Sequence, residues 1–468
     1  MNQGFSIHGT EGVEMAVKLI DRFAEQAPAA LMFRTLFARV FSDRILDQIF
    51  AKHRQRQLEG DLLFSTLLRL LVPVVTGSKS SVHAAYQAAD LEFSSQSIYN
   101  KLKGVEVEVS AALLRTPVVE LQAIQEKAGV LRKDVIPGYH TFIIDGKKFN
   151  GTEHRLKETR NLKSAPLPGM AIALLDTRTE MFVDIECELD AYRCERKILE
   201  PMMERLEENA LYIADRNFCD GPLISAFLKA NAFFIVRHHG RSPSWREIEG
   251  ESRHFKGKDA RDGEVYEQVI EVQLPDSSWH RVRRITVKVK GQTRNGNKEL
   301  HLLTNLPKSV RAARIANAYA ERWTIETCLG YLSQALNAEI NTLCYPAAAE
   351  LCFCLALTLF NMMSTIKSIL GDHGSADDDK VELSYYYLAQ EISECHVGLK
   401  IAINDDHWKI YSKLTLAEFV TFFNKVAAGA NLKRYRKHKR GPKKVPPKRE
   451  SGKKRAHVST QRILLARE

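Results

Sequence analysis

Two short apolar runs that each end in an aspartate constrain the fold of this chain more than any other feature. Residues 141–145 and 211–215 are these runs, and their last residues are Asp145 and Asp215. Continuous apolar runs that alternate with helical segments indicate strands buried on both faces of a sheet. Further strands are expected at 170–175, 181–185 and 232–236, with helices near 195–209 and 223–229. The pattern predicts an α/β fold with a mixed sheet.

The segments on either side of this pattern distribute their apolar residues differently. Apolar residues at three-to-four spacing predict a helical N-terminal region, and alternation with Asn295-Gly296 predicts an antiparallel β insertion with a hairpin turn. A long helix over 309–336 and an apolar helix over 347–369 follow. The expected regions are N-terminal helices (1–138), the α/β core in two parts (139–240 and 308–370), the β insertion (241–307), C-terminal helices (371–432) and a basic flexible tail (433–468).

The positive charge of the chain is concentrated in that tail. The formal net charge is +11, but residues 433–455 hold 13 Lys and Arg against one Glu, which leaves the remaining residues close to neutral. A segment of this composition cannot build a core and suits non-specific binding to phosphates. A solvated tail that only aids solubility is the alternative.

Cysteine usage and hydropathy exclude two classes of protein. The eight cysteines form no Cys-x-x-Cys pair, so we expect reduced thiols in a cytosolic protein and no disulfide scaffold. The strongest apolar run, residues 351–359, is shorter than the ~20 residues that span a bilayer. We therefore expect a buried core helix there and no membrane partner.

Two short helices near residues 82–89 and 95–102 suit a helix-turn-helix, with Ser94 or Ser95 as the cap of the second helix. This would make residues 1–138 a DNA-binding region. An ordinary helical hairpin with a polar outer face explains the same residues equally well. The side chains expected to face DNA are Gln96, Tyr99, Asn100 and Lys101.

The two aspartates should meet, because functional groups of an α/β sheet gather at the carboxyl ends of its parallel strands. Two close carboxylates repel each other unless a cation neutralises them. Hard divalent cations such as Mg²⁺ take oxygen ligands, and two of them can clamp the attacking and leaving oxygens of a phosphodiester. The alternative is that Asp145 and Asp215 only cap the loops after their strands.

A third carboxylate is expected from the long helix. Tyr319, Arg322 and Glu326 are spaced i, i+3 and i+7, so at about 100° per residue they share one face of a helix. An apolar stripe that includes Ile325 and Leu329 runs beside this face. A surface helix with an Arg322–Glu326 ion pair is the alternative.

These residues resemble a known family. The motifs are Asp145-Gly146, Ala214-Asp215-Arg216-Asn217-Phe218 and Tyr319-x2-Arg322-x3-Glu326. They resemble the DDE transposases of bacterial insertion sequences, most closely the insertion-sequence-four type with its Tyr-x2-Arg-x3-Glu-x6-Lys signature. The resemblance covers roughly residues 140–370. It implies a ribonuclease H-like core that carries out metal-dependent DNA cleavage and strand transfer.

The resemblance also implies roles for single residues. Asp145, Asp215 and Glu326 would be catalytic acids that bind Mg²⁺, with Mn²⁺ as a substitute. Tyr319 and Arg322 would contact the phosphates near the cleaved end.

One residue departs from the signature: the lysine position is Ser333. The missing charge is then expected from Lys147 or Lys148. Trp279 and Trp323 could stack on a flipped base, although core packing is the simpler interpretation of both.

The first functional hypothesis is therefore a cut-and-paste DNA transposase. It would bind terminal inverted repeats and target DNA, act as a homodimer on DNA, and lie in the cytoplasm with the bacterial nucleoid. Two alternatives are a decayed transposase or repressor that only binds DNA, which Ser333 supports, and a nuclease that cuts without joining.

Overall fold

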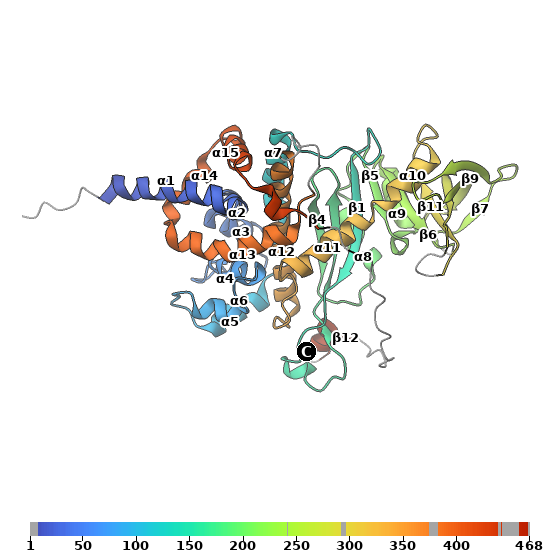
Figure 1. The fold of residues 1–468 in the computed structure, drawn as a ribbon. Helices are drawn as coiled ribbons and strands as arrows, with labels where there is room; N and C mark the ends of the chain where they lie inside the picture. Colours follow the sequence, from blue (N-terminus) through green and yellow to red (C-terminus); the bar gives the residue numbers. More distant parts are fainter. Residues whose placement is uncertain are drawn as a thin grey trace, which may run out of the picture.

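The computed structural model of the chain describes residues 8–240, 242–291, 296–373, 382–438, 441 and 458–466. These residues form a helical region and, beside it, a region built around one large sheet (Figure 1). The helical region combines the N-terminal helices with the C-terminal helices, although the whole sheet lies between them in the sequence. Helices α1 to α7 and α13 to α15 therefore share one helical assembly.

The large sheet has ten strands in the order β4-β3-β1-β5-β6-β11-β10-β9-β7, with β8 also paired to β9. The pairs β1–β5 and β5–β6 are parallel, and the other pairs of this sheet are antiparallel. This confirms the predicted α/β fold, whose mixed sheet is consistent with a ribonuclease H-like core. The strands are β1 (Thr141–Lys148), β3 (Met170–Asp176), β4 (Met181–Glu188), β5 (Leu211–Ala214), β6 (Phe233–His238), β7 (Trp245–Glu247), β8 (His254–Lys258), β9 (Glu264–Gln273), β10 (Trp279–Lys288) and β11 (Glu299–Thr304).

The apolar runs form central strands because both of their faces are covered. Ile143 and Ile213 point into one hydrophobic core, whereas Ile144 and Tyr212 point into the core on the opposite face. Helices α8 (Glu195–Met203) and α9 (Gly221–Lys229) contribute apolar residues to that second core. Burial on both faces explains why these strands have continuous apolar sequences instead of alternating ones.

The β insertion extends the main sheet. Strands β7 to β10 lie within it, and its last strand, β11, pairs with β6 of the core. The expected turn at Asn295-Gly296 falls partly outside the described residues, because Asn295 is among the residues that the structure does not describe. The insertion therefore lengthens the sheet beyond the strands that carry the two aspartates.

The N-terminal region is helical, as the apolar spacing indicated. The side chains of Ser81 and Ser94 cap the fifth and sixth helices by accepting the backbone N–H groups of Ala84 and Ser97. This confirms Ser94 as a cap. The helices are α1 (His8–Gln26), α2 (Pro28–Val40), α3 (Asp43–His53), α4 (Phe64–Val75), α5 (Val82–Gln87), α6 (Ser95–Gly104) and α7 (Val107–Ala128), and the C-terminal ones are α13 (Tyr385–Ala402), α14 (Asp405–Lys413) and α15 (Leu416–Ala428).

The predicted long helix over 309–336 is in fact two helices, α10 (Ala312–Ala320) and α11 (Trp323–Ala335). The backbone tightens between them, since Glu321 N–H donates to Ala318 O at 3.0 Å and Arg322 N–H donates to Tyr319 O at 3.1 Å. These bonds to the third preceding residue are those of a 3₁₀ turn, which often interrupts a helix at a functional position. The turn separates Tyr319 on α10 from Glu326 on α11.

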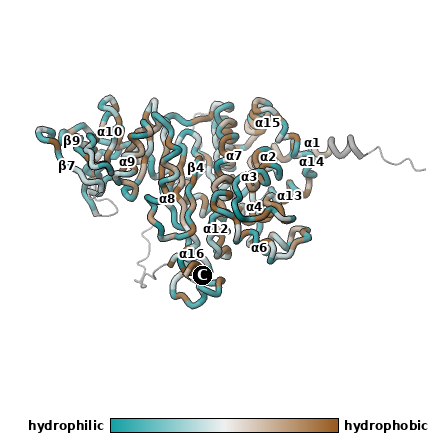
Figure 2. Tube along the Cα trace, turned by 180° about the vertical axis from the view of Figure 1, so that it is seen from behind, coloured by the Kyte–Doolittle hydropathy of each residue, from teal (hydrophilic) through white to brown (hydrophobic). Residues whose placement is uncertain are grey.

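The apolar helix α12 (Pro346–His373) packs between the two regions and contacts α7, α15 and β4. By length and composition it could cross a membrane, but 94% of its most apolar 18-residue window is buried inside the protein. Its hydropathy can be followed in Figure 2. The prediction of a buried core helix is confirmed.

Residues 150–168 leave the sheet after β1 and form a lobe that the end of the chain completes. The lobe contains a short 3₁₀ helix (Lys157–Thr159) and strand β2 (Pro166–Leu167), which pairs in parallel with β12 (Val458–Ser459). Helix α16 (Thr460–Leu465) follows, and the C-terminal end lies at this lobe (Figure 1). We call residues 150–168 together with 458–466 the loop lobe.

The expected flexible tail over 433–468 is therefore only partly described. Residues 439–440, 442–457 and 467–468, which hold most of the basic residues, lie outside the described residues. Residues 458–466 instead form a strand and a helix against residues 150–168, and Ser459 and Thr460 are buried there.

Candidate active site

Asp145 and Asp215 lie side by side where the parallel pairing of β1 with β5 ends, although β1 itself continues to Lys148 beside β3. Ile144 of β1 pairs with Ala214 of β5, so the next residue along each strand is an aspartate. The Oδ1 atom of Asp145 accepts the backbone N–H of Gly146 at 3.0 Å. Strand register alone therefore brings together the two acids that the sequence predicts.

Three residues of α10 and α11 complete this cluster. The hydroxyl of Tyr319 donates to Asp215 Oδ1 at 3.3 Å. The Nη1 atom of Arg322 lies 2.7 Å from Glu326 Oε1 and 3.9 Å from Asp145 Oδ2. Tyr319 and Arg322 are each only 8% exposed. The phenol and the guanidinium thus contact all three carboxylates from one side.

The cluster carries more negative than positive charge. Burial raises the pKa of Asp145 to about 6, the Arg322 guanidinium opposes the rise, and the nearby carboxylates of Glu326 and Asp215 add to it. Burial and the Asp215 carboxylate raise the pKa of the Tyr319 hydroxyl as well. Tyr319 therefore stays protonated at neutral pH and remains a hydrogen-bond donor.

The donor atoms of this cluster fit a hard divalent cation. All three candidate ligands are carboxylates, whose oxygens are the ligands that such a cation takes. Within the described ranges, no group of three or more His, Cys, Asp or Glu is arranged to hold a metal ion. The Arg322 guanidinium contacts both Asp145 and Glu326, so a cation bound to both acids would have to displace it.

The structure places Lys147 beside the residue that departs from the family signature. Its Nζ atom is 3.5 Å from Ser333 Oγ and 2.7 Å from Glu339 Oε1. The ammonium of Lys148 lies 4.6 Å from the centre of the Tyr192 ring and belongs to an exposed residue. An ammonium from β1 therefore lies beside Ser333, where Glu339 partners it.

The four predicted DNA-facing residues of α6 do not share one environment. Gln96 and Asn100 are exposed and hydrogen-bond each other at 2.9 Å, and Tyr99 is half-buried. Lys101 is only 9% exposed, its Nζ donates to Glu59 O, and it lies 4.7 Å from the centre of the Phe50 ring. Lys101 is thus turned inward, and we remove it from the predicted DNA contacts.

Arg237 is a residue of this site that the sequence reasoning missed. Val236 of β6 pairs with Ala214 of β5, so Arg237 stands next to Asp215 in the same row as Asp145. Its positive charge also opposes the rise in the pKa of Tyr319 that burial causes. The rule that selected the two aspartates would have found it, because Arg237 directly follows the apolar run at 232–236.

The two tryptophans have different surroundings. Trp323 is 51% exposed, so core packing is wrong for it, and the Arg322 guanidinium lies 5.7 Å from its ring centre. Trp279 is half-buried at the start of β10, with the Arg246 guanidinium 4.2 Å from its ring centre. Trp323 is therefore the tryptophan that borders the carboxylate cluster.

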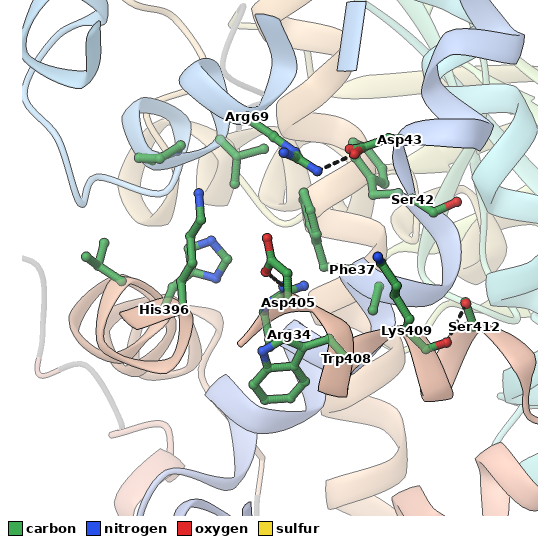
Figure 3. Close-up of a pocket in the computed structure, with 16 residues that line it drawn as sticks. Arg34, Phe37, Ser42, Asp43, Arg69, His396, Asp405, Trp408, Lys409 and Ser412 are labelled. Atoms are coloured by element: carbon green, nitrogen blue, oxygen red, sulfur yellow. Dashed lines mark hydrogen bonds and ion pairs between the residues drawn. The ribbon is translucent and has the colours of Figure 1, made fainter. Parts of the chain in front are cut away.

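A cavity of about 160 Å³ lies elsewhere, in the helical region (Figure 3). Its wall includes Phe37, His396 and Trp408, and Arg34 donates to Asp405 across it at 2.8 Å. None of the predicted site residues lines this cavity. The carboxylate cluster is thus a separate feature, built at the strand ends.

Comparison with known families identifies the domain in which this cluster lies. Residues 136–362 match the family model described as "Transposase DDE domain", and this range contains all three acids. No curated protein matches the chain. The family match supports a DDE transposase, and a transposase domain implies DNA as the partner and a general use of divalent metal ions.

Proposed function

We propose that this protein is a cut-and-paste DNA transposase of the insertion-sequence-four type, with Asp145, Asp215 and Glu326 as its catalytic acids. The single observation that supports this best is their convergence from two strands and one helix on Arg322 and Tyr319. A simple surface ion pair between Arg322 and Glu326 would not need a second and a third carboxylate at the same place.

The three acids would hold Mg²⁺, or Mn²⁺ in its place. A divalent cation bound there would stabilise negative charge on the attacking and leaving oxygens of a phosphodiester. Tyr319 stays protonated, so its hydroxyl can donate a hydrogen bond to a phosphate oxygen. Arg322 can make charge-assisted hydrogen bonds to phosphate once it leaves the carboxylates, since a guanidinium binds phosphate as well as it binds a carboxylate.

Lys147 would take over the phosphate contact of the signature lysine. Its ammonium already contacts the Ser333 hydroxyl, so a phosphate could reach it at the position where relatives carry the lysine. Lys148 is exposed on the same strand and would add a second contact. Lys147 weakens the case for a decayed enzyme, because Ser333 was the main support for that alternative.

Recognition of the terminal inverted repeats is assigned to α6, through Gln96, Tyr99 and Asn100. Cut-and-paste transposition joins two ends, and two copies of one chain can hold two identical ends by symmetry, so we expect a homodimer on DNA. Target DNA would be the second substrate. These reactions place the protein in the cytoplasm with the nucleoid.

The test is incubation of the full chain with duplex DNA from the borders of its own gene, in Mg²⁺ or Mn²⁺. We expect strand cleavage that leaves a 3′-hydroxyl, followed by joined products, and terminal inverted repeats in the border DNA. Binding without cleavage would indicate a repressor, and cleavage without joining would indicate a nuclease. An Asp145→Ala variant that cut at the wild-type rate would contradict the assignment of the acids.

A further inference from the structure

The loop lobe lies between the proposed DNA-reading helix and the catalytic edge of the sheet. It begins two residues after Lys148. Its base is fixed where Glu153 N–H donates to Asn341 O at 3.1 Å and Asn341 Nδ2 donates to Glu153 Oε1 at 3.0 Å. On the other side, the Lys103 ammonium of α6 lies 4.9 Å from the centre of the Tyr345 ring, and the neighbouring Cys344 donates its Sγ–H to Glu153 O at 3.2 Å. The lobe therefore adjoins both places where the proposed function requires DNA.

The outer surface of the lobe is basic. Its exposed side chains include His154, Arg155, Lys157, Arg160 and Lys163. Arg155 pairs with Glu153 at 2.5 Å, whereas Lys157 and Lys163 make no ion pair with any residue that the structure describes. An exposed cation that has no carboxylate partner is free to bind a phosphate.

Two leucines of residues 150–168 point the other way. Leu156 is 8% exposed, and Leu167 is buried beside β12. Leu465 at the end of α16 is 56% exposed, but the exposed side chains of residues 150–168 include four lysines and arginines and no leucine. Nucleic-acid backbones bind to this kind of surface mainly through their charge, and protein partners usually require an apolar centre.

The end of the chain holds the lobe in place. Val458 and Ser459 pair with Pro166 and Leu167, and the side chain of Arg462 pairs with Asp190 and donates to Tyr192 O at 3.1 Å. The Tyr192 ring also lies near the Lys148 ammonium, so this anchor adjoins the catalytic edge. The basic surface is thus carried by a supported element, and its position relative to the acids is defined.

We propose that the loop lobe is a second DNA-contact surface, which binds the backbone phosphates of the duplex read by α6 and guides that duplex toward Asp145, Asp215 and Glu326. Lys157, Arg160 and Lys163 provide the contacts, and residues 458–466 keep them in position. This inference rests on the proposed function, because it takes DNA as the substrate. It concerns binding only and needs no cleavage step.

The test compares two variants of the full chain that lose the same charge. One is Lys157→Ala/Arg160→Ala/Lys163→Ala in the lobe, and the control is Lys229→Ala/Lys413→Ala/Lys425→Ala, three exposed lysines on α9, α14 and α15. Binding to a mixed-sequence duplex of about 40 base pairs is measured at several salt concentrations in EDTA, which removes any cleavage.

We expect the lobe variant to bind about tenfold more weakly than the wild type and its salt slope to fall by about 2.7, as loss of three phosphate contacts predicts. The control variant should bind within about twofold of the wild type. Equal affinities and slopes for the two variants would overturn the inference and leave the proposed function standing. A wild-type protein that bound no DNA at all would overturn both.

A second measurement tests the anchor. Arg462→Ala should speed trypsin cleavage after Lys157 and Arg160, because the lobe loses its contacts with Asp190 and Tyr192. The same variant should weaken DNA binding by about threefold, in the direction of the lobe variant. Unchanged proteolysis together with unchanged DNA binding would show that residues 458–466 do not position the lobe.

Discussion

The functional residues that the sequence predicts lie together in the sheet, whereas those predicted in the helical region do not share one environment. In the sheet, the two predicted aspartates lie next to each other, and the helix acid Glu326 reaches them through Arg322. In the helical region, the predicted DNA-facing set of α6 divides, because Lys101 is buried against Phe50 while Gln96 and Asn100 are exposed.

The two regions differ in what determines where a side chain lies. Residues that directly follow paired parallel strands must emerge at the same edge, so their neighbourhood follows from the chain order and register. The outward face of a short helix depends on which other helices cover it, and those neighbours come from distant parts of the sequence. Substitutions at strand ends should therefore change activity more than substitutions on the outer face of α6.

The largest effect is expected at a strand end. Asp215→Asn should lower the DNA cleavage rate on the order of 10³-fold, because the cluster loses one of its three carboxylates at the point where charge develops. Strand cleavage of labelled DNA measures the rate, and DNA binding should persist. Glu321→Gln is the matched control, since Glu321 is exposed on the turn beside the site. Equal rates for both variants would remove the metal-site assignment.

A core substitution tests whether the two regions are one folding unit. Leu355 is fully buried in α12, which packs against helices and sheet alike. Leu355→Ala should lower the free energy of unfolding by about 3 kcal/mol and shift the helical and sheet signals together in urea. Ile401→Ala is the control, because Ile401 is 82% exposed and should cost less than about 0.5 kcal/mol. Separate transitions would show two independent units.

His140, at the end of β1 opposite to Asp145, should contribute to stability and not to cleavage. Burial opposes its protonation, but its contacts with Asp176 and Glu207 prevail and raise its pKa to about 9. Protonated His140 therefore stabilises the fold fully below its ordinary pKa near 6.5, and this contribution disappears as the pH rises through about 9.

His140→Gln should accordingly lower the free energy of unfolding by about 2 kcal/mol at pH 6 and by little at pH 10. Urea denaturation at both values measures this, with the exposed His83→Gln as the control. A loss of equal size at both pH values would contradict the charged pairing.

The smallest effects should separate two neighbouring residues of α6. Asn100→Ala should weaken binding to the cognate repeat by about 1.4 kcal/mol, or tenfold, and leave stability unchanged. Lys101→Ala should lower the free energy of unfolding by about 1 kcal/mol, because it removes the ammonium that donates to Glu59 O, and leave DNA affinity unchanged. The opposite pattern would show that the inward orientation of Lys101 is wrong.

The sequence was sufficient to predict the α/β fold, the buried α12 and the meeting of Asp145 with Asp215, because continuous apolar runs and strand order specify them. It could not predict the 3₁₀ turn at Arg322, since no glycine or proline marks it; α10 contacts β9 and β10, whereas α11 contacts β1. It also could not predict the return of residues 458–466 to β2, because two-residue strands leave no periodic signal.

The central claim is that three distant carboxylates share one cation site, and metal-directed cleavage of the protein backbone tests it most directly. Fe²⁺ would replace Mg²⁺, ascorbate and peroxide would generate hydroxyl radicals at the bound ion, and mass spectrometry would locate the cuts. The account predicts cuts near Asp145, Asp215 and Glu326 that disappear together in Asp145→Asn. Cuts at only one of these segments, or cuts that persist in the variant, would contradict it.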